Sequence, residues 1–213
     1  MKVGYVIGCQ FTGLAADVRQ WMIDGGHRPD FVLCTKPGGP DETYAPIKEE
    51  LLSAPSINSP EAWAILSSKE PRCAVVFGAG IVSKTTCERF HNMLINVHAG
   101  ELPEFRGINN VEWAYFEDKP LVATVHFIAH KVDSGDIILE RELDKLDVAD
   151  DIEEIRMHAF ERSFRLVPEA LDVIERADVL PRRQATEERT NRYMMHPFLK
   201  DILTRRLKSK RRG

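Results

Sequence analysis

The sequence predicts an α/β domain whose mostly parallel sheet carries helices on both faces. Short runs of β-branched and aromatic residues alternate with segments whose apolar residues recur every three or four positions, a pattern typical of βαβ units. One run, Cys73–Phe77, is entirely apolar and lies between Pro71 and Gly78, as expected for a strand buried on both faces. The chain of 213 residues is long enough for one core of this kind.

The first half of the chain holds the strands and short helices of these units. Strands are expected at Val3–Ile7, Phe31–Cys34, Cys73–Phe77 and Met93–His98. A helix follows the first strand, because apolar residues recur at helical spacing over 14–22 before Gly25-Gly26 interrupts them. Ser59 is a suitable N-cap and Pro60 a suitable first helical residue, so a second helix is predicted over Pro60–Ser67. Residues 35–45 are rich in proline and glycine and should form a loop.

The second half is expected to close the sheet and cover it. Val122–Ala129 and Ile137–Glu142 should pair as a hairpin at one end of the sheet. Apolar residues recur every three or four positions over 152–174, which predicts one long amphipathic helix bent at Pro168. A further helix is expected near 198–207. We assign residues 1–181 to one domain and residues 182–213 to a basic C-terminal extension.

Composition excludes several classes of protein. Hydrophobic residues make up 43% and charged residues 29% of the chain, which is typical of a globular protein and excludes intrinsic disorder. The longest uncharged apolar stretch, Cys73–Ser83, contains two glycines and is far too short to span a bilayer. No signal-peptide pattern precedes the first strand, and no Cys-x-x-Cys pair occurs among Cys9, Cys34, Cys73 and Cys87. We therefore expect a cytoplasmic protein without membrane contact, disulfides or a zinc site.

Charge is unevenly distributed along the chain. Residues 182–213 contain 11 basic and three acidic residues, although the whole chain has a net charge of −4. Six of the basic residues lie at the extreme end: Arg205, Arg206, Lys208, Lys210, Arg211 and Arg212. Such a run can neutralise nucleic-acid phosphates, but here it lacks interleaved aromatic residues for base stacking. A solvated tail, or one resting on the protein's own acidic surface, is the commoner alternative, so nucleic acid is not an expected partner.

Glycine-bearing segments follow several predicted strands, at the sheet edge where ligands of parallel sheets bind. Asn96 and His98 are two residues apart in a strand, so they share a face and could together stabilise charge developing on an oxygen. An isolated Asn-x-His is also common as a hydrogen-bonded strand end. Asp133 and Asp136 equally suit a solvated turn, and Arg106 suits either an anion clamp or a surface position.

The order of these segments is more specific than any one of them. Asn96-Val-His98 is followed by Leu102-Pro-Glu-Phe-Arg-Gly107, Thr124-Val-His-Phe127 and Val132-Asp-Ser-Gly-Asp-Ile137. In this order the motifs resemble the catalytic half of the formyltransferase family, which includes glycinamide ribonucleotide, methionyl-tRNA and sugar N-formyltransferases. The resemblance covers roughly residues 1–141. It implies a Rossmann-like fold and an enzyme that moves a formyl group from 10-formyltetrahydrofolate to a primary amine.

The same resemblance implies the residues of the site. Asn96, His98 and Asp133 would be catalytic: the first two stabilise the oxyanion, and Asp133 orients His98 and collects the amine proton. The amine is itself the nucleophile, so no metal is expected. The implied folate-contacting residues are Phe77, Gly78, Ala79, Gly80, Ile81, Val132, Ser134, Gly135 and Asp136, although a plain glycine turn explains Gly78 and Gly80 as well. The expected acceptor-contacting residues are Cys9, Gln10, Phe11, Thr12, Arg106, Gly107 and Asn109.

Three departures from the family pattern bear on the substrates. Ala129-His130-Lys131 stands where the family often has Asp-Glu-Gly, so the pterin loop should differ in shape or charge. Residues 8–13 lack the Gly-Asn-Gly-Ser-Asn pattern of glycinamide ribonucleotide enzymes, and the tRNA enzyme's C-terminal domain does not follow. We therefore expect a nucleotide-linked amino sugar as acceptor. The alternatives are a glycinamide ribonucleotide or methionyl-tRNA formyltransferase, a 10-formyltetrahydrofolate hydrolase, and a non-catalytic folate-fold binding protein.

Three smaller features have competing interpretations. His126 and His130 are four residues apart, but they lie in a strand-like run and are not expected to bind zinc. Asn109-Asn110 could bind a sugar or cap the following helix, and capping is the favoured interpretation. The long helix and the tail leave room for a homodimer.

Overall fold

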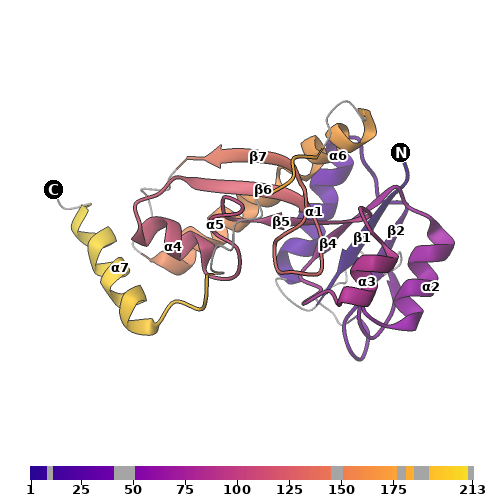
Figure 1. Cartoon of the computed structure of the whole chain (residues 1–213), viewed down its shortest axis with the longest axis horizontal. Coiled ribbons are helices and arrows are strands. Elements are labelled where there is room, and N and C mark those ends of the chain that lie inside the picture. The colour runs from indigo at the N-terminus through magenta and orange to yellow at the C-terminus, as the bar shows by residue number, and fades with distance from the viewer. Residues whose placement is uncertain (9–11, 41–50, 145–150, 177–180, 185–191, 211–213) are drawn as a thin grey trace.

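A computed structural model describes residues 1–8, 12–40, 51–144, 151–176, 181–184 and 192–210. The strands are β1 (Val3–Ile7), β2 (Phe31–Cys34), β3 (Leu51–Ser53), β4 (Cys73–Phe77), β5 (Leu94–His98), β6 (Leu121–Phe127) and β7 (Ile137–Leu143). The helices are α1 (Thr12–Asp24), α2 (Pro60–Lys69), α3 (Lys84–Arg89), α4 (Asn110–Phe116), α5 (Ile152–Phe164), α6 (Val167–Arg176) and α7 (Pro197–Lys210). The N-terminus lies beside β1 and β2, and α7 lies at the opposite end of the molecule (Figure 1).

The seven strands form one sheet in the order β3-β2-β1-β4-β5-β6-β7. The pairs from β3 to β5 are parallel, and β5–β6 and β6–β7 are antiparallel. The predicted mostly parallel sheet and its terminal hairpin are therefore confirmed. Antiparallel pairing sets Asn96 opposite His126 and His98 opposite Thr124, so two neighbouring strands bring polar side chains to one place.

Helices cover both faces of the sheet, as predicted. On one face, α1 and α6 pack against Tyr5 and Ile7 of β1, and on the other, α2 and α3 pack against Val6 and Val76. This division follows from the alternation of side chains along each strand. The cap of α2 is also as predicted, because the Ser59 hydroxyl accepts a hydrogen bond from the Ala62 amide.

The single long helix predicted over 152–174 is wrong. The structure has two helices, α5 and α6, separated at Arg165–Leu166. Pro168 has no amide hydrogen, and its ring would clash with the carbonyl of Phe164, so α5 cannot continue through it. Instead Pro168 occupies the first turn of α6, where a missing donor costs nothing. The short elements β3 and α3 were not predicted.

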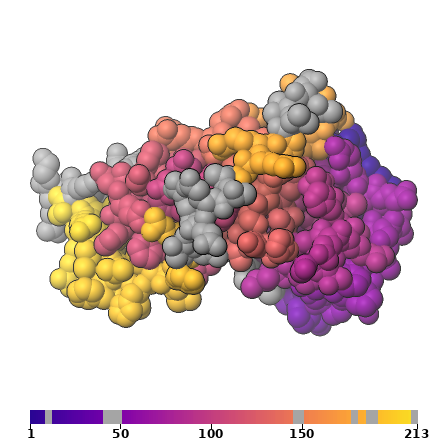
Figure 2. All heavy atoms as spheres, viewed as in Figure 1, coloured from indigo at the N-terminus to yellow at the C-terminus, as the bar shows by residue number. Residues whose placement is uncertain are grey.

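The helix α7 packs on the rest of the molecule, at the end opposite the N-terminal strands (Figure 2). Leu203 of α7 is buried in a third apolar cluster that joins α4 and α5, and Met195 is also buried. Arg192 pairs with Glu117, and Lys200 pairs with Glu112 and Glu153. Arg192 and Lys200 therefore rest on the protein's own acidic groups. They precede the terminal run of six basic residues, of which Arg205 pairs with Asp201 of the same helix.

No helix among the described residues combines the length and the apolar composition that a bilayer crossing requires. Cys34, Cys73 and Cys87 are buried, and burial raises the pKa of the Cys73 thiol to about 12. Cys9 lies outside the described residues. These three thiols therefore act as small apolar side chains of the core.

Candidate active site

A cavity of about 490 Å³ opens at the edge of the sheet where β4 and β5 end. Asn96 and His98 reach it from β5, His126 from β6, and Asp133 from the turn after β6. The three residues expected to be catalytic are thus brought together on one wall. This edge is where ligands bind in open sheets of this kind.

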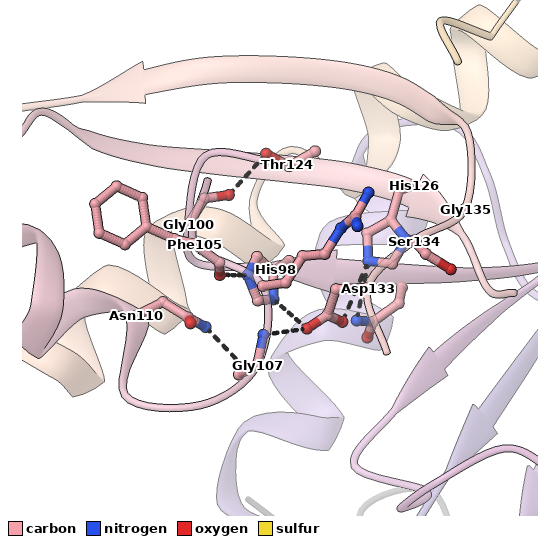
Figure 3. Close-up of polar contacts among 12 residues, drawn as sticks. His98, Gly100, Phe105, Gly107, Asn110, Thr124, His126, Asp133, Ser134 and Gly135 are labelled. Atoms are coloured by element: carbon pink, nitrogen blue, oxygen red, sulfur yellow. Dashed lines mark hydrogen bonds and ion pairs between the residues drawn. The ribbon is translucent and has the colours of Figure 1, made fainter. Parts of the chain in front are cut away.

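His98 and Asp133 form the centre of this wall (Figure 3). The Nδ1 atom of His98 lies 3.5 Å from Oδ2 of Asp133, and its Nε2 lies 2.7 Å from the carbonyl oxygen of Phe105. Because a carbonyl only accepts, Nε2 carries a proton. Nδ1 faces a carboxylate, so the pair attracts most strongly when this nitrogen is protonated too.

The Asp133 carboxylate is fixed from a second loop. The backbone amide of Gly107 donates to its Oδ2 at 2.9 Å. Asp133 has a left-handed backbone with φ 47°, a conformation that Asp and Asn adopt more readily than most other side chains. The turn and the 106–109 loop therefore jointly determine where the carboxylate points.

His126 belongs to the same wall, although it was not expected to be a site residue. Its ring is 2% exposed, Nδ1 lies 2.8 Å from the Phe127 carbonyl oxygen, and Nε2 lies 3.4 Å from Nδ2 of Asn96. Burial lowers the pKa of His126 to about 4, with the neighbouring His98 and Arg106 acting in the same direction and Asp133 opposing. The neutral ring donates from Nδ1 and accepts at Nε2, which fixes the amide nitrogen of Asn96 towards it.

The depressed pKa of His126 predicts a pH-dependent stability. The unfolded chain binds a proton near pH 6.5 and the folded protein only near pH 4, so the free energy of unfolding falls as pH drops through this window. We expect this residue to account for a loss of roughly 3 kcal/mol. His126→Gln should flatten the pH dependence in urea titrations between pH 7 and pH 4. An unchanged slope would show that His126 titrates normally in the folded protein.

The expected folate loop lines the opposite wall of the cavity. Phe77, Gly78, Ala79, Gly80 and Ile81 all border it, as does Val132. Gly78 and Gly80 have φ of 63° and 77°, conformations in which a side chain would be strained. The backbone there can approach a flat ligand closely. Ala129, His130 and Lys131, which depart from the family pattern, border the same space.

Three other residues expected to contact folate do not border the cavity. Among the described residues of this turn, the cavity lining ends at Asp133. The Ser134 hydroxyl donates to the Lys131 carbonyl oxygen, and the Asp136 carbonyl accepts from the Phe127 amide. Gly135 packs on the backbone of Phe127. These residues shape the turn that carries Asp133, and they do not border the cavity.

Replacing Gly135 by alanine is therefore expected to destabilise the protein. A Cβ atom at Gly135 would lie 1.7 Å from the Phe127 carbonyl oxygen, so backbone must move. We expect a loss of about 1 to 3 kcal/mol of unfolding free energy, typical of overpacking, measured by urea denaturation. Gly13→Ala is the matched control, since a Cβ there meets nothing within 4 Å. Equal stabilities of the two variants would contradict this interpretation.

The residues expected to contact the acceptor divide into three groups. Gly107 and Asn109 border the cavity. Arg106 does not, because its Nε and Nη2 donate to Oε1 of Gln184 at 3.0 and 2.6 Å. Cys9, Gln10 and Phe11 lie outside the described residues, as does the side chain of Thr12.

The favoured capping role of Asn109 is wrong. It occupies the N-cap position of α4, but its backbone is left-handed, and no side-chain cap bond forms among the described residues. Its Nδ2 donates to Oε1 of Glu112 at 2.6 Å, and its Oδ1 accepts from the Met195 amide at 2.9 Å. The side chain instead ties α4 to the C-terminal extension.

A third wall of the cavity is polar and incompletely bonded. Asn110 and Glu112 of α4 and Arg156 of α5 border the cavity. Within the described part of the chain, Asn110 Oδ1, Glu112 Oε2 and Arg156 Nε are buried without a hydrogen-bond partner. Such atoms are costly unless water or a ligand satisfies them. Two of these atoms are acceptors and one is a donor, so this part of the lining is polar in both senses.

Comparison with known proteins agrees with this geometry. Residues 40–171 match the family model described as formyl transferase. The chain belongs to the formyltransferase family. Methionyl-tRNA formyltransferase of Parabacteroides distasonis is 33% identical over 92 residues, which are 42% of this chain and 28% of that relative. The chain matches between 28% and 51% of the length of three such relatives. A match to part of a protein does not show the activity of the whole protein.

Solved formyltransferase structures share the fold. A phosphoribosylglycinamide formyltransferase from Anaplasma phagocytophilum has a TM-score of 0.69 at 17% identity, covering 89% of this chain and 96% of its own. The formyltransferase PseJ from Anoxybacillus kamchatkensis has a TM-score of 0.59 at 19% identity, covering 90% and 85%. That protein was crystallised with UDP-4,6-dideoxy-4-formamido-L-AltNAc and tetrahydrofolate. Together these structures confirm the predicted Rossmann-like fold.

The cavity of this formyltransferase family member fits a folate formyl donor. Its volume lies within the range of about 300 to 1,000 Å³ usual for small-ligand sites. Val76, Phe77, Ile81, Ile128 and Val132 supply apolar surface for a flat ring. The left-handed backbone at Gly78 and Gly80 leaves room for close approach of that ring.

Proposed function

We propose that this protein transfers a formyl group from 10-formyltetrahydrofolate to the primary amine of a nucleotide-linked amino sugar. The observation that carries the proposal is the convergence of Asn96, His98 and Asp133 on one wall of the cavity. An amide donor, an imidazole and a carboxylate are the groups that amine attack on a formyl carbon requires. The glycine loop at residues 77–81 would hold the pterin.

Each of the three residues has a separate role in this proposal. The amine nitrogen attacks the formyl carbon, and negative charge develops on the formyl oxygen. Asn96 donates to that oxygen through Nδ2, and His98 assists as a protonated or hydrogen-bonding group. Asp133 takes the proton that the nitrogen loses, and the departing N10 of the folate gains a proton. The products are a formamide and tetrahydrofolate, so no oxidant or reductant is consumed.

The polar wall supports a hydroxyl-rich acceptor. The side chains of Asn110, Glu112 and Arg156 give this part of the lining both acceptors and donors, and the hydroxyl groups of a sugar can serve as either. The charges around Glu112 are balanced, because Arg156 and Lys200 face Glu112 and Glu153. A neutral polar ligand is therefore favoured over an anion at this wall. The sugar-nucleotide complex of PseJ is in line with this choice.

The proposal is tested by incubating the purified protein with 10-formyltetrahydrofolate and a panel of amines. The panel holds nucleoside-diphosphate amino sugars, glycinamide ribonucleotide and methionyl-tRNA. Tetrahydrofolate release is followed by absorbance, and the formamide product by mass spectrometry. Formylation of an amino sugar is the expected result. Turnover only with another amine would identify that amine, instead of an amino sugar, as the acceptor. Release without any amine would indicate a hydrolase, and no release at all would exclude the catalytic role.

A further inference from the structure

Gln184, in the C-terminal extension, joins the two loops that hold the Asp133 carboxylate. Its Oε1 accepts from Arg106 at 3.0 and 2.6 Å, and its Nε2 donates to the carbonyl oxygens of Asp133 and Gly135 at 2.9 and 2.7 Å. Both ends of one amide group are therefore used, one on each loop. Gln184 is 51 residues away from Asp133 along the chain.

These bonds form a closed ring around Asp133. Gln184 grips the backbone of Asp133 on one side and the side chain of Arg106 on the other. The next residue, Gly107, donates its amide to the Asp133 carboxylate at 2.9 Å. Main chain and carboxylate of the same residue are thus held by one connected set of hydrogen bonds, so the position of each loop depends on the other.

The turn needs such support because of its backbone. Asp133 has φ 47°, a left-handed conformation that costs a non-glycine residue free energy. The ladder between β6 and β7 ends at His126 and Ile137. Beyond it the Phe127 amide donates to the Asp136 carbonyl and the Ser134 hydroxyl to the Lys131 carbonyl, and neither bond holds the carbonyl groups of Asp133 and Gly135. Gln184 supplies the only side-chain donor to the carbonyl groups of Asp133 and Gly135 among the described residues.

We propose that Gln184 is a positioning residue for Asp133 in formyl transfer. This inference rests on the proposed function, because it assigns Gln184 a role only through the reaction of Asp133. A carboxylate that must meet a proton within hydrogen-bonding distance loses rate steeply when displaced, about 100-fold for a shift of 1 Å. The C-terminal extension is on this basis part of the catalytic unit.

Two substitutions separate positioning from general stability. Gln184→Glu keeps the acceptor for Arg106 and adds an ion pair, but it replaces the donor to the Asp133 and Gly135 carbonyls with a repelling oxygen. Gln184→Leu removes both the acceptor for Arg106 and the donor to the two carbonyl groups. Arg182→Ala is the matched control, because Arg182 lies in the same segment, and its exposed side chain pairs with Glu140 at 3.0 Å outside both loops.

We expect both Gln184 variants to lose about 10- to 100-fold in kcat, with KM for the formyl donor changed less than about threefold. Gln184→Glu should retain its thermal unfolding midpoint, and Arg182→Ala should retain its activity. If activity instead follows stability, so that Gln184→Glu is as active as the wild type, Gln184 has only a structural role and the inference is overturned.

A measurement without turnover keeps this test separate from the proposed function. Hydrogen–deuterium exchange should become faster in residues 106–109 and 131–136 of both Gln184 variants, and in neither loop of Arg182→Ala. Faster exchange together with an inactive wild type would reject formyl transfer, but it would still show that Gln184 holds the two loops together. Unchanged exchange in both loops would show that Gln184 does not hold them, and it would overturn the inference whatever the wild-type activity.

Discussion

Asp133→Asn is expected to lower kcat by about 100- to 10,000-fold while folate binding is retained. The amide has the same shape, tolerates the left-handed backbone, and still accepts from the Gly107 amide through its oxygen. It cannot take a proton from the attacking amine, and it no longer pairs with a protonated His98. Rates are measured with saturating donor and acceptor, and binding of tetrahydrofolate by calorimetry.

Asp136→Asn is the control for this substitution. Asp136 lies three residues further along the same turn and loses the same charge, but it does not border the cavity, and the Phe127 contact involves only its backbone. Its activity should stay within about threefold of the wild type. A fully active Asp133→Asn variant would show that Asp133 takes no part in the chemistry.

Replacing Asn96 should have the second-largest effect. Asn96→Ala deletes the amide donor next to the formyl oxygen, which typically costs about 100- to 1,000-fold in kcat. Asn96→Asp should lose more, because its carboxylate would face a developing negative charge. KM for the formyl donor should change little, since the bond strengthens mainly in the transition state. Single-turnover kinetics in rapid-quench experiments measure the chemical step directly.

Asn58→Ala is a control for the loss of an amide group. Asn58 bridges the Ile81 carbonyl and the Ser83 amide behind the folate loop, so its loss should weaken folate binding more than it slows the chemical step. We therefore expect Asn96→Ala to lower mainly kcat, and Asn58→Ala to raise mainly KM for the formyl donor. If Asn96→Ala raises KM and leaves kcat unchanged, Asn96 binds the donor and has no role in stabilising the oxyanion.

Local rules predicted most of the fold correctly. The cap at Ser59 and Pro60, the apolar run Cys73–Phe77 and the hairpin pattern after Val122 each depend on neighbours in the chain. The catalytic role expected for Asn96, His98 and Asp133 came from the resemblance of the ordered motifs to the formyltransferase family, because the shared strand face of Asn96 and His98 also suited a hydrogen-bonded strand end. Their approach to Asp133 then follows from the turn between β6 and β7.

Interactions across the chain could not be predicted. Gln184 is an ordinary polar residue in the sequence, and only the folded structure sets its amide between two distant loops. Leu51–Ser53 is too short for an alternating pattern to stand out. His126 did carry a signal, because antiparallel pairing of the predicted strands sets it opposite Asn96, but that register was not fixed by the sequence. Gly135 was assigned to ligand contact although its space is filled by Phe127.

The distance of 51 residues between Asp133 and Gln184 has a consequence for biosynthesis. On the ribosome, the sheet and both strands of the hairpin emerge well before Gln184 does. A nascent chain can therefore pack the two apolar clusters on the faces of the sheet before Gln184 reaches the turn at Asp133. If Gln184 positions Asp133 as proposed, catalytic competence is acquired late in translation, after most of the sheet has emerged.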